Sequence, residues 1–161
     1  MTFPSHADPV VLYPREGEYA VIGGNTRCTF KVTGRDTANR FGLFEFEMEP
    51  GAMGARPHIH SHLTEIFYVI AGEVQLLAGK ERVTGTPGTL LLVPPTAVHA
   101  FANTGRAPAT LLIMFCPAHE REKYFTGLAE LTKDGRQPSR EELVALMRRF
   151  DQEPAGEIEF P

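Results

Sequence analysis

Two short segments of the chain hold histidines and a glutamate at spacings that suit a metal site. The first, HIHSHLTEIFYVIAG, places His58 and His60 two residues apart and Glu65 five residues after His60. The second, GTLLLVPPTAVHAFAN, adds His99. Alternate side chains of a β-strand point to one face, so His58 and His60 can enter the same cavity. Three imidazoles and one carboxylate fit an octahedral divalent metal that keeps two positions free for water or substrate.

The donor set indicates a class of metal and does not select one element. Imidazole and carboxylate ligands suit Fe, Mn, Ni, Co, Cu and Zn as divalent ions alike. Neither cysteine, Cys28 or Cys116, lies near the histidines in the sequence, which argues against a thiolate zinc site. The two cysteines suit small buried apolar positions, with a disulfide or a catalytic thiol as the alternatives. We therefore expect one divalent transition metal as the cofactor.

His62 continues the alternation of His58 and His60, and three interpretations of it stay open. On a regular strand it would point inward and compete as a ligand, so that the set would be His60, His62 and His99. It can instead lie at the pocket rim, support the ligands and take part in catalysis beside Glu65. The third interpretation is a plain exposed histidine.

Length and composition narrow the class of protein. A chain of 161 residues with 42% apolar residues predicts one domain with a sizeable core. Its 15 glycines and 13 prolines favour short strands joined by tight turns. A net charge of -4 without a basic run argues against nucleic acid or an anionic membrane as a partner. The first residues have neither a basic start nor a long apolar stretch, so we expect no signal peptide, no membrane span and a cytoplasmic protein.

Alternation typical of strands continues through most of the chain. Phe44, Phe46 and Met48 share one face of a segment whose other face carries glutamates, the pattern of a half-buried antiparallel strand. Short strands broken by Gly and Pro continue to residue 103, and residues 110–115 form a last apolar strand. Before them, the proline-rich start predicts an irregular arm with an edge strand at Val10 to Tyr13.

The period changes to a helical one after Cys116. Pro117 suits the first turn of a helix, and Ser139 with Glu142 three residues later forms a capping box for a second helix. The apolar stripes of both helices indicate core packing and include no candidate ligand. We expect a mobile tail at residues 151–161.

These patterns predict a single domain in three parts. An N-terminal arm with strands spans residues 1–35, a barrel core spans residues 36–116, and the C-terminal helices and tail span residues 117–161. Strands followed by helices favour an all-β barrel or jelly roll with a C-terminal α-helical extension on its outside. The barrel interior would then be the functional cavity.

A set of apolar residues is expected to face that interior. They are either ordinary barrel core or the wall of a hydrophobic pocket that selects a planar or apolar organic substrate. The set comprises Phe44, Phe46, Met48, Phe67, Val69 and Phe101.

The two histidine segments resemble the paired motifs of the cupin superfamily. The first motif, G-x5/6-H-x-H-x3/4-E-x6-G, is matched by Gly51, His58, His60, Glu65 and Gly72. The second, G-x5-P-x-G-x2-H-x3-N, is matched by Gly88, Pro94, His99 and Asn103. One position departs, because Thr96 stands where the second motif has its inner glycine, which normally serves a tight turn.

The resemblance implies a small single-domain cupin, that is, an RmlC-like jelly roll or double-stranded β-helix. It implies His58, His60, Glu65 and His99 as the metal ligands and leaves His62 in the loop before Glu65. Many single-domain cupins pair their barrels through edge strands, so a homodimer is expected as well.

Motif and size also resemble small cupin dioxygenases of the quercetinase type. This favours a metal-dependent dioxygenase acting on a small aromatic or apolar organic molecule. One alternative is a non-redox isomerase or polyketide cyclase, in which the ion polarises a carbonyl and a pocket base moves a proton. Another is a small-ligand-binding cupin without turnover. The fold alone does not decide among them.

Overall fold

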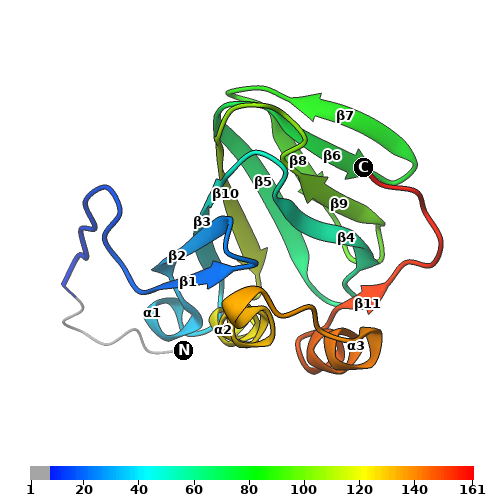
Figure 1. Ribbon diagram of the computed structural model, residues 1–161. Helices are drawn as coiled ribbons and strands as arrows, with labels where there is room; N and C mark the ends of the chain where they lie inside the picture. Colours follow the sequence, from blue (N-terminus) through cyan, green and yellow to red (C-terminus); the bar gives the residue numbers. More distant parts are fainter. Residues whose placement is uncertain (1–7) are drawn as a thin grey trace.

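Two antiparallel β-sheets form the body of the protein in a computed structural model that describes residues 8–161. The first sheet holds, in spatial order, β1 (Tyr19–Ile22), β2 (Thr26–Val32), β3 (Gly42–Met48), β10 (Ala109–Cys116), β5 (Thr64–Ala71) and β8 (Leu90–Val93). The second sheet holds β11 (Glu153–Pro154), β4 (Met53–Ile59), β9 (His99–Ala102), β6 (Val74–Ala78) and β7 (Glu81–Gly85). The sheets face each other as a jelly roll (Figure 1), which confirms the predicted all-β barrel.

Strand β3 shows how alternation in the sequence becomes a barrel wall. Phe44, Phe46 and Met48 point into the core and are at most 2% exposed. On the outer face, the carboxylate of Glu45 lies 3.7 Å from the ammonium of Lys31 on β2. Apolar area removed from water on one face, with charges left on the other, fixes which face of the strand turns inward.

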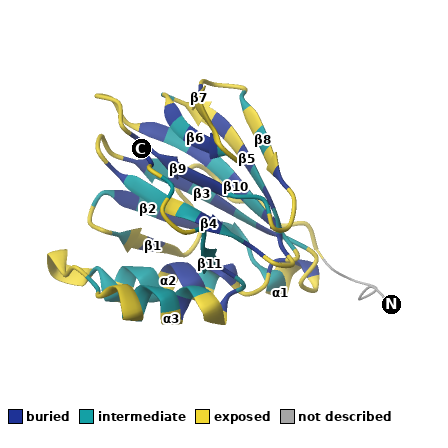
Figure 2. Ribbon diagram, turned by 90° about the vertical axis from the view of Figure 1, so that its right-hand side faces the viewer, coloured by how far each residue is buried: buried dark blue, intermediate teal, exposed yellow. Residues whose placement is uncertain are grey.

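The helices lie outside the barrel, as the C-terminal extension was predicted to do. They are α1 (Gly34–Thr37), α2 (Arg121–Leu131), the 3-10 helix η1 (Lys133–Gly135) and α3 (Arg140–Arg149). Figure 2 shows α2 and α3 side by side beneath the sheets. The buried residues of α2 are Arg121, Tyr124 and Phe125. None of the helices within residues 8–161 has the length and apolar character needed to cross a membrane.

A local capping signal begins α3, whereas packing against the barrel holds α2. The Glu142 backbone N–H donates to the Ser139 hydroxyl at 3.2 Å, and the Ser139 N–H donates to the Glu142 carboxylate at 2.8 Å, so the predicted capping box begins α3. Phe125 anchors α2, because its ring lies 5.1 Å from that of Phe44 and 5.2 Å from that of Phe46. Helix α2 therefore closes one end of the barrel with aromatic side chains.

Two expectations about the ends of the chain were wrong. Residues 10–13 form no strand and Val10 is 78% exposed, because the prolines at positions 9 and 14 lack donor N–H groups and no strand pairs with this segment. The last residues are not a free tail, because β11 pairs with β4 and Phe160 is only 6% exposed. Residues 1–7 of the predicted N-terminal arm lie outside the described residues.

Candidate metal centre

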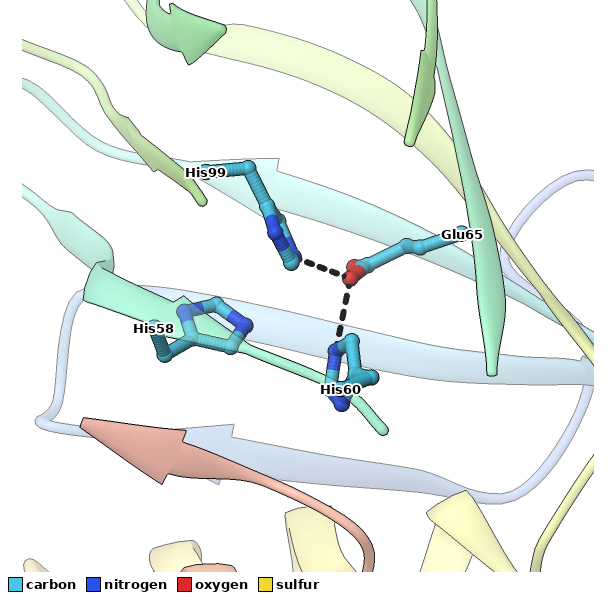
Figure 3. A group of neighbouring side chains, drawn as sticks. All are labelled: His58, His60, Glu65 and His99. Atoms are coloured by element: carbon cyan, nitrogen blue, oxygen red, sulfur yellow. Dashed lines mark hydrogen bonds and ion pairs between the residues drawn. The ribbon is translucent and has the colours of Figure 1, made fainter. Parts of the chain in front are cut away.

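The four residues with metal-ligand spacing meet inside the barrel. His58 lies on β4, His60 directly after it, Glu65 at the start of β5 and His99 at the start of β9. Strand pairing places His58 opposite His99, and all four residues are at most 2% exposed. One ligand atom from each lies within 4.8 Å of the others. Figure 3 shows the side chains converging on one space.

Each imidazole is held in one orientation by a backbone carbonyl. The Nδ1 atoms of His58, His60 and His99 lie 2.7, 2.6 and 3.0 Å from the carbonyl oxygens of Arg56, Asp151 and Ala97. A carbonyl can only accept, so each Nδ1 carries the hydrogen and each Nε2 is left with a lone pair for a metal.

The contacts of Glu65 indicate that a cation belongs among these groups. Its Oε2 atom lies 2.9 Å from His60 Nε2 and 2.6 Å from His99 Nε2. With their hydrogens on Nδ1, neutral imidazoles would turn lone pairs toward this carboxylate. Either added protons or a shared metal ion must separate these atoms, and three imidazoles with one carboxylate are a suitable donor set for a divalent transition metal.

The electrostatics of the cluster favour the metal-binding forms of the ligands. Burial alone would raise the pKa of Glu65, but the neighbouring His99 and the close contacts of its carboxylate with the Nε2 atoms of His60 and His99 hold this pKa well below its usual range. Burial, followed by the proximity of His99, lowers the pKa of His58 well below its usual value of 6.5. Near neutral pH the site therefore offers a carboxylate at Glu65 and a neutral imidazole at His58.

His62 lies outside this cluster. Its side chain is 85% exposed, and its Nδ1 atom lies 3.3 Å from a carboxylate oxygen of Asp151. The loop after β4 breaks the strand alternation, so the ring turns to solvent while His58 and His60 turn inward. Of the two ligand sets considered from the sequence, the structure brings together the one that contains His58.

Asp151 is a supporting residue that sequence reasoning missed. Its carboxylate accepts hydrogen bonds from the backbone N–H groups of Ser61, His62 and Leu63 at 3.0, 2.8 and 3.1 Å. Burial would raise the pKa of Asp151, but these donors lower it below its usual value. Its carbonyl also accepts from His60. A lone Asp after a helix belongs to no motif, so nothing in the sequence marked this position.

A cavity adjoins the ligands and is lined by polar and apolar residues. The polar ones are His58, Glu65, Arg121 and Gln152. The rest of the lining is largely apolar and consists of Ile22, Phe46, Gly54, Ala55, Phe101, Ile113, Phe115, Tyr124, Phe125 and Leu128.

The predicted pocket residues divide into two groups. Phe46 and Phe101 line the cavity, and their rings meet edge to face at 5.6 Å. The other four are buried in the core and are not among the lining residues; they are Phe44, Met48, Phe67 and Val69.

Two backbone positions shape the surroundings of the site. A Cβ at Gly54 would lie 2.1 Å from the Phe101 ring, so glycine is needed for that ring to pack against β4. Thr96, at the motif's inner glycine position, adopts a left-handed φ of 69°. Its N–H donates to the His60 carbonyl at 2.7 Å, so the tight turn forms in spite of the missing glycine.

Comparisons agree with the fold and the motifs. The family described as "Cupin domain" matches residues 44–115, a span that contains all four candidate ligands. The chain therefore belongs to the cupin superfamily. It is 30% identical over 118 residues to "Germin-like protein subfamily 2 member 2" of Arabidopsis thaliana, which covers 70% of this chain and 51% of that protein. The chain thus spans about half the length of this relative.

Solved structures share the architecture at low identity. KdgF from Halomonas sp. superposes with a TM-score of 0.62 at 16% identity, covering 71% of this chain and 99% of that one. A cupin sugar phosphate isomerase from Silicibacter pomeroyi gives a TM-score of 0.52 at 25% identity, covering 58% and 60%. The polyketide cyclase RemF from Streptomyces resistomycificus gives 0.51 at 24% identity, covering 64% and 70%.

Proposed function

We propose that this protein is a metal-dependent enzyme, a dioxygenase that acts on a small aromatic or apolar organic molecule. The observation that carries the proposal is the convergence of four buried ligand atoms, within 4.8 Å of one another, beside a cavity with a largely apolar lining. His58, His60, Glu65 and His99 would hold one divalent transition metal. A redox-active ion bound there would supply a place where molecular oxygen and an electron-rich substrate react.

The chain's own groups have distinct tasks in this proposal. Three neutral imidazoles add no charge and Glu65 adds one negative charge, so a bound divalent ion keeps a net charge near +1. Phe46 and Phe101 exclude water and bind the flat body of the substrate.

Proton transfer is assigned to Glu65. It is the one carboxylate among the residues that line the cavity. It would accept the substrate's acidic proton at a carboxylate oxygen. His62 has no such part here, since its ring points to solvent.

Oxygen uptake tests the proposal. Protein purified without a histidine tag would be stripped, reloaded separately with each of the six candidate ions and mixed with planar phenols in an oxygen electrode. We expect uptake with at least one redox-active ion and a substrate of the panel, none with Zn(II), and none in the His99→Ala protein. Glu65→Gln should keep part of the metal but lose most turnover. A protein that binds no transition metal at all would overturn the proposal.

A non-redox isomerase or cyclase is the second candidate. The 25% identity to a solved cupin sugar phosphate isomerase favours it. In this case Zn(II) would support turnover without oxygen consumption, with Glu65 again moving the proton. Saturable ligand binding without any turnover would instead indicate a binding protein.

We further propose that the protein is a homodimer. Strand β8 is at the edge of its sheet, and Leu90 and Leu92 on it are 59% and 56% exposed. Tyr68 and Ile70 on the neighbouring strand β5 are 44% and 42% exposed. A second copy of the chain would cover this apolar face.

A further inference from the structure

Arg121 is a charged side chain buried in the wall of the metal cavity. It begins helix α2, is 2% exposed, and lines the same cavity as His58 and Glu65. It also lies beyond residues 44–115, the part of the chain that matches the cupin family. The helix after the barrel thus brings a cation to the candidate active site.

The contacts of Arg121 are incomplete for a buried cation. One terminal nitrogen donates to the Phe150 carbonyl at 3.0 Å and the other to the Gln152 amide oxygen at 2.8 Å. The guanidinium carbon lies 4.1 Å from the ring centre of Tyr124. The ring centres of Phe115 and Phe125 lie 4.6 and 5.3 Å from the same carbon. The Arg121 Nε–H is buried without a partner. Neutral acceptors and three aromatic rings leave the positive charge of Arg121 without a negative partner, which is costly in a dry interior.

No neighbouring carboxylate neutralises this charge. Within residues 8–161, no carboxylate oxygen forms an ion pair with Arg121 at 4.0 Å or less. Glu65 already faces His60 and His99, and the Asp151 carboxylate is used by the backbone of the loop at residues 61–63. Burial lowers the pKa of Arg121, and the two acids oppose this only in part, by acting at longer range.

Metal binding would increase the positive charge of the cavity. A divalent ion adds two positive charges, the Arg121 guanidinium adds one, and Glu65 removes one. Two net positive charges would then remain at the cavity wall. The Asp151 carboxylate lies behind the loop and does not line the cavity. A carboxylate entering the cavity would reduce this excess by one charge and could accept a hydrogen bond from the free Nε–H.

We propose that Arg121 binds the carboxylate of the substrate, so that the substrate is a small organic acid with an apolar body. This rests on the proposed function and names its substrate class. The planar guanidinium fork matches a carboxylate, and the body of the acid would lie against Phe46 and Phe101. Gln152 is held toward Arg121 because its amide nitrogen donates to the Tyr124 hydroxyl at 3.1 Å. It serves as the neutral partner of Arg121 when no acid is bound.

The test compares benzoate with benzamide, which have similar shapes but different charges. The full-length protein would be loaded with Zn(II), which prevents oxidation, and titrated by calorimetry. Wild type should bind benzoate more tightly than benzamide. Arg121→Gln should bind benzoate about 10 to 100-fold more weakly, with benzamide affinity unchanged. Arg121→Lys should show a smaller loss, because it keeps the charge without the fork. Arg140→Gln, at an exposed arginine, is the matched control and should behave as wild type.

A direct measurement remains available if the Gln variant does not fold. In 15N-edited NMR spectra of wild type, the Arg121 Nε–H resonance should move on adding benzoate and stay in place on adding benzamide. An arginine that only ties α2 to residues 150–152 would show neither the shift nor the selective loss of benzoate affinity.

Two results would overturn the inference. One is a benzoate affinity that does not change in a folded, metal-loaded Arg121→Gln protein. The other is an Arg121 resonance that is indifferent to benzoate. Elemental analysis distinguishes a failure of this inference from a failure of the proposed function. The proposed function fails if the protein binds no metal. A metal-loaded protein in which Arg121 does not respond to benzoate overturns this inference alone.

Discussion

The backbone carbonyl of Asp151 accepts a hydrogen bond of 2.6 Å from Nδ1 of His60, a candidate ligand 91 residues earlier in the chain. This contact makes the segment after α3 part of the candidate metal centre. The C-terminal helices contribute no ligand, as expected, but they deliver the groups that orient one. A hydrogen bond of this kind fixes the tautomer of a ligand and raises its basicity.

Removing the Asp151 carboxylate should weaken metal binding. In Asp151→Ala the backbone N–H groups of Ser61, His62 and Leu63 lose their acceptor, and the loop that carries His60 loosens. We expect metal affinity to fall by about 10 to 100-fold. Competition with a chromogenic chelator would measure it.

The control for this variant is Asp134→Ala. Asp134 is exposed and has the same left-handed φ of 55° as Asp151, so backbone strain changes equally in the two variants. Equal metal affinity in the two variants would contradict a supporting role for the Asp151 carboxylate.

The histidines should differ sharply in their effect on metal content. His99→Ala removes a buried donor and should reduce the bound metal to well below half. His62→Ala and His119→Ala change exposed rings and should leave it near the wild-type level. Elemental analysis of the dialysed proteins measures this, and an empty His62→Ala site beside a filled His58→Ala site would reverse the ligand assignment.

The sequence made the four candidate ligands predictable because local rules place them. Alternation turns His58 and His60 to one face, and the antiparallel pairing of β4 with β9 then sets His99 opposite His58. The same alternation in β3 predicted the buried side of the barrel. These inferences need only the strand period and the order of the strands.

Arg121 and Asp151 were not predictable for the opposite reason. Each reaches the site through the packing of helices against the barrel, and helical periodicity shows which face is apolar but not what that face meets. The predictions for the two ends of the chain were wrong for the same reason. Whether residues 10–13 or β11 becomes a strand depends on an available partner edge, which local sequence does not reveal.

Replacing Thr96 with glycine should stabilise the protein. A β-branched residue at a left-handed φ costs about 1 to 2 kcal/mol. The greater conformational freedom of glycine in the unfolded chain offsets about 0.5 to 1 kcal/mol of the strain relieved by the substitution. The Thr96 side chain is exposed, so little packing is lost, and the net gain in unfolding free energy should be about 0.5 to 1 kcal/mol.

Urea denaturation would measure the effect of Thr96→Gly. The matched variant is Thr104→Gly, at an exposed position without a positive φ, which should lose stability. A loss of stability in both variants would show that the turn before His99 carries no strain.

The metal-free protein should lose stability as the pH falls below 6.5. The pKa of His58 is lowered in the folded protein from its ordinary value of 6.5. Below pH 6.5 the unfolded chain therefore binds a proton at His58 that the folded chain does not bind, and this favours unfolding. Glu65 acts in the same direction below 4.5, its ordinary value, because its folded pKa is also lowered.

Denaturation of the stripped protein between pH 8 and pH 5 measures the contribution of His58. Each unit of pKa difference corresponds to about 1.4 kcal/mol. His58→Phe should show a shallower loss over this range, and His119→Ala should follow wild type. A stability that rises on acidification through pH 6 would contradict the direction assigned to His58.

Charge on the apolar face of β8 should separate the proposed dimer. Burying Leu90 and Leu92 against a second copy would remove their side chains from water, and lysine at both positions would replace that gain with a desolvation penalty. Multi-angle light scattering at low micromolar concentration should find twice the 17.8 kDa chain mass for wild type and a single chain mass for Leu90→Lys/Leu92→Lys.

The control is Val83→Lys, which changes an apolar residue that is 37% exposed on the other sheet, and this variant should remain dimeric. A wild-type protein that runs only as one chain would exclude the dimer, and a dimer that survives both lysines would move the contact to another face.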